Sequence, residues 1–390
     1  YYTATKVQPY APYAVSAAAG EAMDRARERW AVALAVSPGE VVFGPSTSMN
    51  TYVLAEAFGA SGIGRGDEVL VTNQDHEANT GAFRRMADRI GATLVEWRTD
   101  AVTGRLDVDE GLSLLSPATR LVTLPHASNI VGEENDVQRV CAAAHRIGAR
   151  VVVDGVSFAP HSFPAVTDLD ADVYLFSLYK TYSVHQGLMV VRNGLLEELP
   201  NQSHFFNDDD ASKRLNPAGP DHAQVAASAA VLDYVVAIDG AAPGAAPGAA
   251  SSDVAGPELR AAVDRVSTRW RHHEDALTAS LLAALGDRDD VRVLGPTATA
   301  SLGPRHRCPT VAFVPHTVAP DTVAERLARR GVQASAGHFY AWRVLDGMDV
   351  DPRRGVVRLS AVHYTSPGDI DRAIDALDEA LDEALDDSPR

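Results

Sequence analysis

The stretch from residue 151 to residue 187 reads VVVDGVSFAPHSFPAVTDLDADVYLFSLYKTYSVHQG and contains two strand-like runs, each followed by a polar group. The first run ends in Asp154, and the second, at residues 172–176, is followed closely by Lys180. Short apolar runs bounded by turn residues are typical of buried strands. The stretch therefore predicts an acidic group at the end of one strand and a lysine just past the next.

Lys180 stands out because lysine is rare in this chain. Only Lys6, Lys180 and Lys213 are lysines among the 35 basic residues. A lysine amine can lose its proton and attack a carbonyl, whereas a guanidinium cannot. A carboxylate at one strand end and a lysine past the next form the pair that pyridoxal 5'-phosphate (PLP) needs, since the carboxylate keeps the pyridinium nitrogen charged and the amine forms the Schiff base. Taken singly, a surface lysine and a turn-forming aspartate would look the same.

The wider pattern around this pair resembles a known family. A D-G-x-x-x-x-P-H block begins at Asp154, and an F-S-x-Y-K block ends at Lys180. Together they resemble the class V aminotransferase family of fold-type I PLP enzymes, especially its cysteine desulfurase and selenocysteine lyase-like branch, over residues 17 to 385. The resemblance implies an α/β fold, with a mainly parallel seven-stranded-type sheet in a large domain and a smaller C-terminal α+β domain. It also implies a homodimer with active sites at the interface.

The net charge and the cysteine content limit the kinds of partner that this protein can have. The net charge of −17 argues against nucleic acid and anionic membranes. Two cysteines give neither a disulfide framework nor metal-ligand spacing, so no metal is expected. No apolar run is long enough to span a membrane and no signal peptide is recognised, so a cytoplasmic location is expected. Relative to the family, a short stretch before Tyr1 that lies near the substrate in relatives is expected to be missing.

The order of patterns along the chain predicts its domains. Between residues 41 and 192, short apolar runs alternate with helical patterns, which indicates a mainly parallel sheet covered on both faces. Ligands bind such sheets beyond the strand ends. We expect an N-terminal arm at residues 1–16, a large PLP-binding domain at 17–240 and a small C-terminal domain at 257–390. Between them, residues 241–256 (AAPGAAPGAASSDVAG) read as a flexible low-complexity connection.

Three polar groups that follow other predicted strands are assigned to the cofactor by the resemblance. Thr47 and Ser48, in a turn before a helix, match the hydroxyl positions of the family's phosphate-binding turn, although a simple helix cap would look the same. His76 stands where an imidazole stacks on the PLP ring. Asn129 stands where an asparagine hydrogen-bonds the phenolic oxygen of the ring. With Lys180 and Asp154, His76 completes the expected catalytic set.

Further cofactor contacts implied by the resemblance depart from the family pattern. Ser157 replaces a glutamine or histidine near the ring oxygen, and Tyr179 replaces a histidine beside the lysine, whereas Ser177 fits. Gly219 lies in a segment that reaches the partner's cofactor phosphate in relatives. Gly219 stands where relatives often have a threonine, so only its backbone could contact the phosphate. These departures indicate a diverged member with its own substrate.

The expected substrate site lies in the C-terminal part. Arg358 aligns with the family arginine that holds an amino acid's α-carboxylate through a bidentate fork. Desulfurases need a loop cysteine because only a thiolate attacks the sulfur. Here Tyr340 stands in its place, and Cys308, next to a proline, is a poor substitute. His338 and Tyr340, with Phe339 and Trp342, would form an aromatic wall suited to a substituent larger than a thiol, although an ordinary packed loop would read alike.

These residues support several reactions on one site. After transaldimination at Lys180, its amine can act as the base at Cα while the ring accepts electrons. The leading hypothesis is a C–S β-lyase acting on an amino acid or S-substituted cysteine conjugate. The alternatives are decarboxylation, oxidative deamination, transamination or epimerisation at Cα, and cysteine desulfuration. A cofactor-free interaction module is a further alternative, which the intact Asp154/Lys180 pair argues against. A nucleotide-binding protein is disfavoured because no glycine-rich phosphate motif follows a strand.

Overall fold

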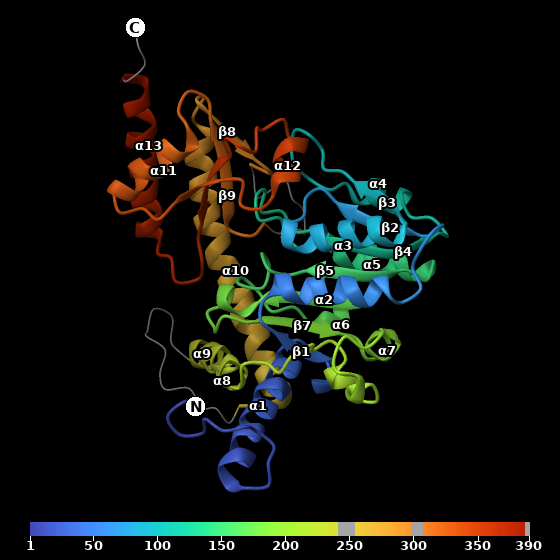
Figure 1. Ribbon diagram of the computed structural model, residues 1–390. Coiled ribbons are helices and arrows are strands. Elements are labelled where there is room, and N and C mark those ends of the chain that lie inside the picture. Colours follow the sequence, from blue (N-terminus) through green and yellow to red (C-terminus); the bar gives the residue numbers. More distant parts are fainter. Residues whose placement is uncertain (241–253, 298–306, 387–390) are drawn as a thin grey trace.

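A seven-stranded sheet forms the centre of the large domain in this computed structural model, which describes residues 1–240, 254–297 and 307–386 (Figure 1). The strand order is β1-β7-β6-β5-β4-β2-β3. Strand β7 runs antiparallel to both β1 and β6, and the other neighbours are parallel. The strands are β1 (Val41–Gly44), β2 (Glu68–Thr72), β3 (Thr93–Trp97), β4 (Thr119–Pro125), β5 (Arg150–Asp154), β6 (Val173–Ser177) and β7 (Gly187–Val191).

Helices cover both faces of this sheet because its central strands are apolar on both sides. In β5, Val151 and Val153 face one core while Val152 faces the other. One face packs against α1 (Ala14–Ala33), α5 (Val137–Arg146), α8 (His222–Ser228), α9 (Ala230–Asp239) and the first half of α10 (Gly256–Gly286). The other packs against α2 (Thr47–Gly59), α3 (Glu77–Ile90) and α7 (Asn193–Glu198). The predicted parallel α/β architecture is thereby confirmed.

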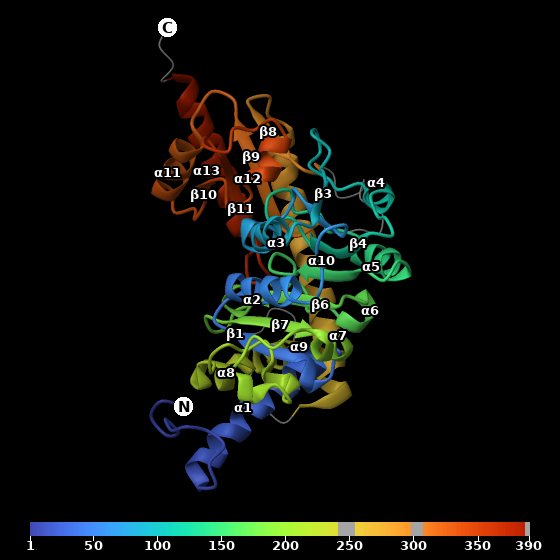
Figure 2. The same ribbon diagram turned by 45° about the vertical axis from the view of Figure 1, so that its right-hand side comes forward.

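The smaller domain is built on a four-stranded antiparallel sheet of order β10-β11-β9-β8. Its strands are β8 (Val291–Leu294), β9 (Thr310–Pro315), β10 (Ser335–Gly337) and β11 (Val356–Ser360), and its helices are α11 (Pro320–Arg329), α12 (Trp342–Gly347) and α13 (Pro367–Asp386). Figure 2 shows this domain at the top, and the C-terminal part of α10 packs into its core. The predicted α+β character of the C-terminal part is confirmed; β8 and β10 were not expected from the pattern.

Helix α10 is shared by the two domains. Leu259, Val263 and Trp270 belong to the large-domain core, whereas Leu281 and Leu285 belong to the small-domain core. The boundary at residue 257 therefore stays a prediction. Most of the expected low-complexity connection, residues 241–253, lies outside the described residues. The remaining short elements are α4 (Val108–Ser113), α6 (Val166–Leu169), η1 (Pro38–Glu40), η2 (Leu178–Lys180), η3 (Phe205–Asn207) and η4 (Ala211–Lys213).

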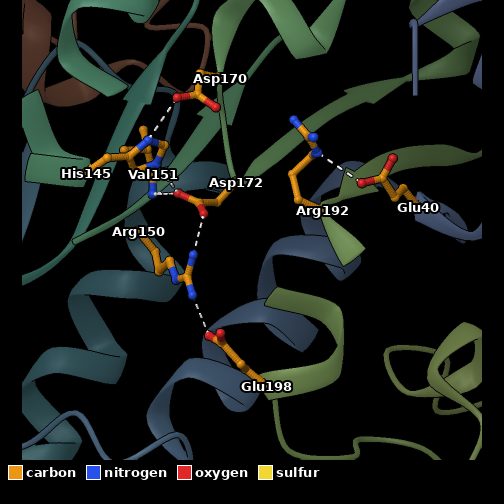
Figure 3. Close-up of polar contacts among 8 residues, drawn as sticks. All are labelled: Glu40, His145, Arg150, Val151, Asp170, Asp172, Arg192 and Glu198. Carbon is orange, nitrogen blue, oxygen red and sulfur yellow. Dashed lines mark hydrogen bonds and ion pairs between the residues drawn. The ribbon is translucent and has the colours of Figure 1, made fainter. Parts of the chain in front are cut away.

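A buried aspartate ties the strands together at the edge opposite the polar strand ends (Figure 3). Asp172 accepts hydrogen bonds from the backbone N–H of Val151 at 2.8 Å and from Arg150 at 3.0 Å, and its carboxylate lies 2.8 Å from Nε2 of His145. Arg150 and Val151 belong to β5, His145 belongs to α5 and Asp172 directly precedes β6, so these contacts fix β5 and α5 against β6.

Within the described ranges, no helix has both the length and the apolar composition needed to cross a bilayer.

Candidate active site

The first wall of the site is the turn between β1 and α2. Ser46 caps α2 by accepting a hydrogen bond from the backbone N–H of Met49 at 3.2 Å. The hydroxyl oxygens of Thr47 and Ser177 lie 2.7 Å apart, which joins this turn to the end of β6. A Cβ added to Gly187 would stand 2.4 Å from the backbone of Ser46, so only glycine allows β7 to approach so closely. The helix N-terminus with its hydroxyls forms a cup suited to a phosphate.

His76 forms the second wall and is held in one tautomer. Its Nδ1 accepts a hydrogen bond from the backbone N–H of Ala78 at 3.1 Å, which caps α3. Burial, with the positive charges of Lys180 and Arg358, lowers the pKa of His76 to about 4. The imidazole is therefore neutral at pH 7, with its proton on Nε2. A neutral flat ring in this position suits stacking on a heteroaromatic ring.

Asp154 lies at the end of β5, buried at the base of the cavity. It accepts a hydrogen bond from the backbone N–H of Val156 at 2.8 Å. Burial raises its pKa to about 6, although that N–H and the charge of Lys180 oppose the rise. A carboxylate in this environment is stabilised by a cationic partner. The protonated ring nitrogen of PLP is a partner of that kind.

Lys180 ends the short helix η2, directly after β6, and its side chain is exposed to the cavity. Its Nζ lies 5.9 Å from the ring centre of Tyr179, whose ring stacks on His185 at 4.5 Å. The structure thus brings most of the sequence-predicted cofactor residues to the carboxyl ends of β1, β2, β4, β5 and β6. They line one pocket: Thr47, Ser48, His76, Asn129, Asp154, Ser157, Ser177, Tyr179 and Lys180.

Three predicted residues lie elsewhere. Gly219 is exposed and is not among the residues that line the pocket of its own chain. Its contact with a partner's cofactor stays a prediction. His338 and Trp342, both predicted in the aromatic wall, do not line the cavity either. Nδ1 of His338 accepts a hydrogen bond from the backbone N–H of Tyr340 at 3.1 Å, so His338 stabilises the loop without facing the cavity.

Arg358 enters the outer cavity from β11. Its guanidinium donates to the backbone carbonyl of Asn129 at 3.0 Å and covers the ring of Phe339. Burial lowers its pKa to about 10, and within the described part of the chain it has no acidic partner. A desolvated guanidinium without a carboxylate is a binding site for an anionic ligand.

The loop between β10 and α12 closes over the pocket. Phe339 and Tyr340 both have left-handed backbones, with φ of 49° and 58°. Three contacts hold them: the Asn129 side-chain amide donates to the Phe339 carbonyl at 2.9 Å, the Glu77 N–H donates to the Tyr340 carbonyl at 2.8 Å, and the Tyr340 ring lies 5.2 Å from that of His76. Consecutive non-glycine residues in this region are strained, which is common where a loop shapes a site.

Neither cysteine is available as a nucleophile. Cys141 is 0% exposed and Cys308 is 2% exposed. Burial raises the pKa of both thiols, and nearby carboxylates add to this effect. Since a thiolate is the reactive form, both are inert in this fold.

One residue of the outer cavity was not predicted as part of the site, and another makes a contact beyond its predicted role. Phe339 was expected as part of an aromatic wall, and the structure also packs it against the guanidinium of Arg358. His161 lines the same cavity, with Nδ1 at 3.1 Å from the carboxylate of Glu274. The P-H end of the D-G-x-x-x-x-P-H block marked His161, but its partner is 113 residues away in sequence. No local signal links the two.

These features fit PLP. The α2 cup with Gly187 leaves room for a phosphate, the neutral His76 ring can stack, and Asp154 offers a buried carboxylate to the ring nitrogen. Asn129 also fits: its Oδ1 is buried without a hydrogen-bond partner in the described chain, and its NH₂ group uses one of two hydrogens on Phe339, leaving one free. Fold and site together define the class of PLP-dependent enzymes of fold-type I.

Comparison with known proteins agrees. The sequence matches the family described as aminotransferase class-V over residues 1–242 and 260–373. It is 31% identical over 383 residues to the "Aminotransferase-like protein FGM3" of Gibberella zeae, covering 97% of this chain and 88% of that protein. It is 30% identical over 325 residues to a "Probable cysteine desulfurase" of Pseudomonas putida, covering 80% and 71%.

Solved structures show the same fold. The cysteine desulfurase CsdA of Escherichia coli superposes with a TM-score of 0.77 at 23% identity, covering 98% of this chain and 88% of that chain. A cysteine desulfurase from Thermococcus onnurineus NA1 gives a TM-score of 0.80 at 20% identity, covering 98% and 90%. The chain belongs to the class V aminotransferase family. It is a PLP-dependent enzyme of the cysteine desulfurase-like branch.

Proposed function

We propose that this enzyme is a C–S β-lyase that acts on an S-substituted cysteine or a similar amino-acid conjugate. The observation that carries the proposal is the loss of every accessible thiol from an otherwise complete site. Cys141 and Cys308 are buried, and Tyr340 stands on the loop where desulfurases present their cysteine. Elimination needs a base and an electron sink but no sulfur acceptor.

Each residue has a role in this reaction. Arg358 would hold the α-carboxylate through its guanidinium fork, which lacks an acidic partner in the described chain. The amine of Lys180 would take the proton from Cα. When bound, PLP supplies the electron sink, and Asp154 would keep its ring nitrogen protonated. The Cα–H and Cβ–S bonds break and a carbon–carbon double bond forms; the thiol leaves, and hydrolysis of the enamine gives pyruvate and ammonia.

The shape of the outer cavity supports a substituent larger than a thiol. The cavity has a volume of about 870 Å³ and is bounded by Phe339, Tyr340 and Tyr52. Aromatic walls of this kind favour an apolar group on sulfur.

We also propose a homodimer, in line with the exposed position of Gly219 on a loop outside its own site. Light scattering after size exclusion would test it.

Cysteine desulfuration is the second candidate, because several relatives carry that name. Other outcomes at Cα, namely decarboxylation, oxidative deamination, transamination and epimerisation, share the same Lys180 base. The enzyme should be incubated with cysteine, with S-alkyl and S-aryl cysteines and with other amino acids, and assayed for pyruvate, ammonia, thiol, sulfide, carbon dioxide and aldehyde. Thiol and pyruvate in equal amounts support the lyase. Carbon dioxide, an aldehyde or persulfide without pyruvate would refute it.

The lysine assignment has its own test, because the chain has only three lysines. Borohydride reduction followed by mass spectrometry should find the cofactor attached to Lys180. Lys180→Ala should lose the attachment and the reaction. Lys213→Ala is the matched control, since Lys213 lies on the surface in an ion pair with Asp210.

A further inference from the structure

A second histidine of the active-site cavity is oriented by a buried carboxylate. His161 is 6% exposed and Glu274, on α10, is 2% exposed. Nδ1 of His161 lies 3.1 Å from Oε2 of Glu274. This is the only side-chain hydrogen bond that His161 makes to another described residue. A carboxylate on Nδ1 fixes the ring and leaves Nε2 as the group that can exchange a proton with a ligand.

The position of His161 relative to Lys180 is fixed by the fold. His161 follows Asp154 in a helical turn, in which the backbone N–H of Ala159 donates to the carbonyl of Gly155 at 2.8 Å. Ser157, in the same turn, lines the outer cavity together with His161. From the other direction, the hydroxyl of Tyr182, two residues past Lys180, donates to the carbonyl of Pro160 at 2.7 Å. The lysine loop and the histidine turn are therefore joined directly.

Among the described residues, two histidines line the outer cavity, His76 and His161, and they have different hydrogen-bond partners. His76 uses Nδ1 to cap α3, and its pKa is lowered to about 4 by burial and nearby cations, so its ring is a neutral imidazole and not an acidic imidazolium at neutral pH. His161 has an anionic partner instead. Burial raises the pKa of Glu274, while the hydrogen bond to His161 and the charges of His161, His273 and Arg271 oppose that rise. Oε1 of Glu274 has no hydrogen-bond partner in the described chain, so its carboxyl group contacts His161 through Oε2 alone.

We propose that His161, oriented by Glu274, is the proton donor to the leaving group at the substrate's Cβ. This inference rests on the proposed lyase reaction. A substrate held by Arg358 at its carboxylate, with its Cα–H facing Lys180, would direct its side chain into the remaining volume, which His161 lines with Ser360 and Val362. As the Cβ–S bond breaks, the sulfur takes the electron pair and Nε2–H of His161 supplies the proton. The neutral thiol leaves, and solvent returns a proton to the imidazole in the next cycle.

The test compares two leaving groups in one enzyme. An S-aryl cysteine releases an acidic thiol that needs no proton donor, whereas an S-alkyl cysteine releases a weakly acidic thiol that does. We expect His161→Gln to lower kcat on the S-alkyl substrate on the order of 10²–10⁴-fold, the usual contribution of general acid catalysis, with little change on the S-aryl substrate. Glu274→Gln, which alters a positioning residue, should lower kcat on the S-alkyl substrate by a smaller factor, again with little change on the S-aryl substrate. His272→Gln, on the exposed side of α10, is the control.

The outcomes separate the inference from the proposed function. An equal loss on both substrates in His161→Gln would indicate a structural role and overturn the inference, while wild-type thiol release would still support the lyase. If wild-type enzyme releases no thiol from either substrate, the lyase proposal and the inference fall together. If His161→Gln does not fold or bind PLP, the ratio of the two rates in Glu274→Gln decides: an unchanged ratio overturns the inference and a changed ratio supports it.

Discussion

The guanidinium carbon of Arg358 lies 3.9 Å from the ring centre of Phe339. Phe339 belongs to the loop whose carbonyl groups are held by Asn129 and Glu77, so Arg358 and the loop over the pocket form one unit. This contact leaves the guanidinium desolvated on one face and free to bind a carboxylate with its edge. A substrate carboxylate would therefore bind a group that is already oriented.

Arg358→Lys should weaken substrate binding because an ammonium cannot reproduce the fork. The loss of a charge-assisted hydrogen bond of about 1.5–3 kcal/mol corresponds to a fall in kcat/KM of roughly 10- to 150-fold, mainly through KM. Steady-state kinetics would measure it, and the absorbance of bound PLP should not change. Arg353→Lys is the control, because Arg353 is exposed over Trp342. Equal kinetics in wild type and Arg358→Lys would remove Arg358 from the substrate site.

Phe339→Leu should keep the apolar cover of the loop but remove the aromatic face. A cation–π contact contributes roughly 0.5–2 kcal/mol, so we expect KM to rise about 2- to 30-fold with kcat nearly constant. Inhibition by a simple carboxylate should weaken by the same factor. A change in kcat alone would show that Phe339 acts on the chemical step and not on the orientation of Arg358.

Asp154→Asn should stabilise the enzyme without cofactor while abolishing tight PLP binding. The folded chain keeps the Asp154 proton up to about pH 6, whereas the unfolded chain releases it near 3.8, so ionisation lowers folding stability as pH rises through this window. The asparagine side chain does not ionise, so the variant does not lose this folding stability as the pH rises. Its free energy of unfolding at pH 7 should exceed that of wild type by about 1–3 kcal/mol, and the difference should vanish below about pH 4.

Urea denaturation of both cofactor-free proteins at the two pH values measures this difference. Asp168→Asn, on the surface, is the control. A difference that is the same at both pH values would show that the effect is not due to ionisation of Asp154.

Gly187→Ala should disturb the phosphate cup and not the ring site. Its Cβ would meet the backbone of Ser46 at 2.4 Å and of Thr47 at 2.6 Å, and overpacking of this kind costs about 1–3 kcal/mol. If that cost falls on cofactor binding, PLP affinity should drop roughly 5- to 150-fold. Titration with PLP and with pyridoxal, which has no phosphate, would locate the effect, since only PLP should bind more weakly.

The control for this variant is Gly194→Ala, where an added Cβ meets nothing within 4 Å. If pyridoxal and PLP lose affinity equally, the substitution acts on the whole site, and the α2 turn is not a separate phosphate cup.

The double variant Cys141→Ala/Cys308→Ala should keep its turnover number. Both thiols are buried and their pKa values are raised, so neither can form a persulfide on the reaction path. The two small cavities should cost on the order of 1–2 kcal/mol of stability in total. Product assays on correctly folded protein would measure the turnover, and loss of sulfur release would instead support cysteine desulfuration.

Much of the cofactor site could be predicted from the sequence because its residues follow strands. Asp154, Lys180, His76 and Thr47 each come just after an apolar run, and the carboxyl ends of parallel strands meet at one edge. Strand ends and one rare residue type, lysine, predicted the Asp154/Lys180 pair that PLP needs, and the family resemblance assigned His76 and Thr47 to the cofactor. The departures at Ser157, Tyr179 and Tyr340 were equally visible in the sequence.

The sequence by itself determined the class of chemistry, because residue type and strand-end position are local properties. Only the tertiary structure decided which side chains surround the substrate. The contact of Arg358 with Phe339 depends on the left-handed backbone of the loop, and the pairing of His161 with Glu274 joins residues 113 positions apart. The first contact forms within the small domain and the second where α10 packs against the turn after β5, and no periodicity in the chain records which residues that packing brings together.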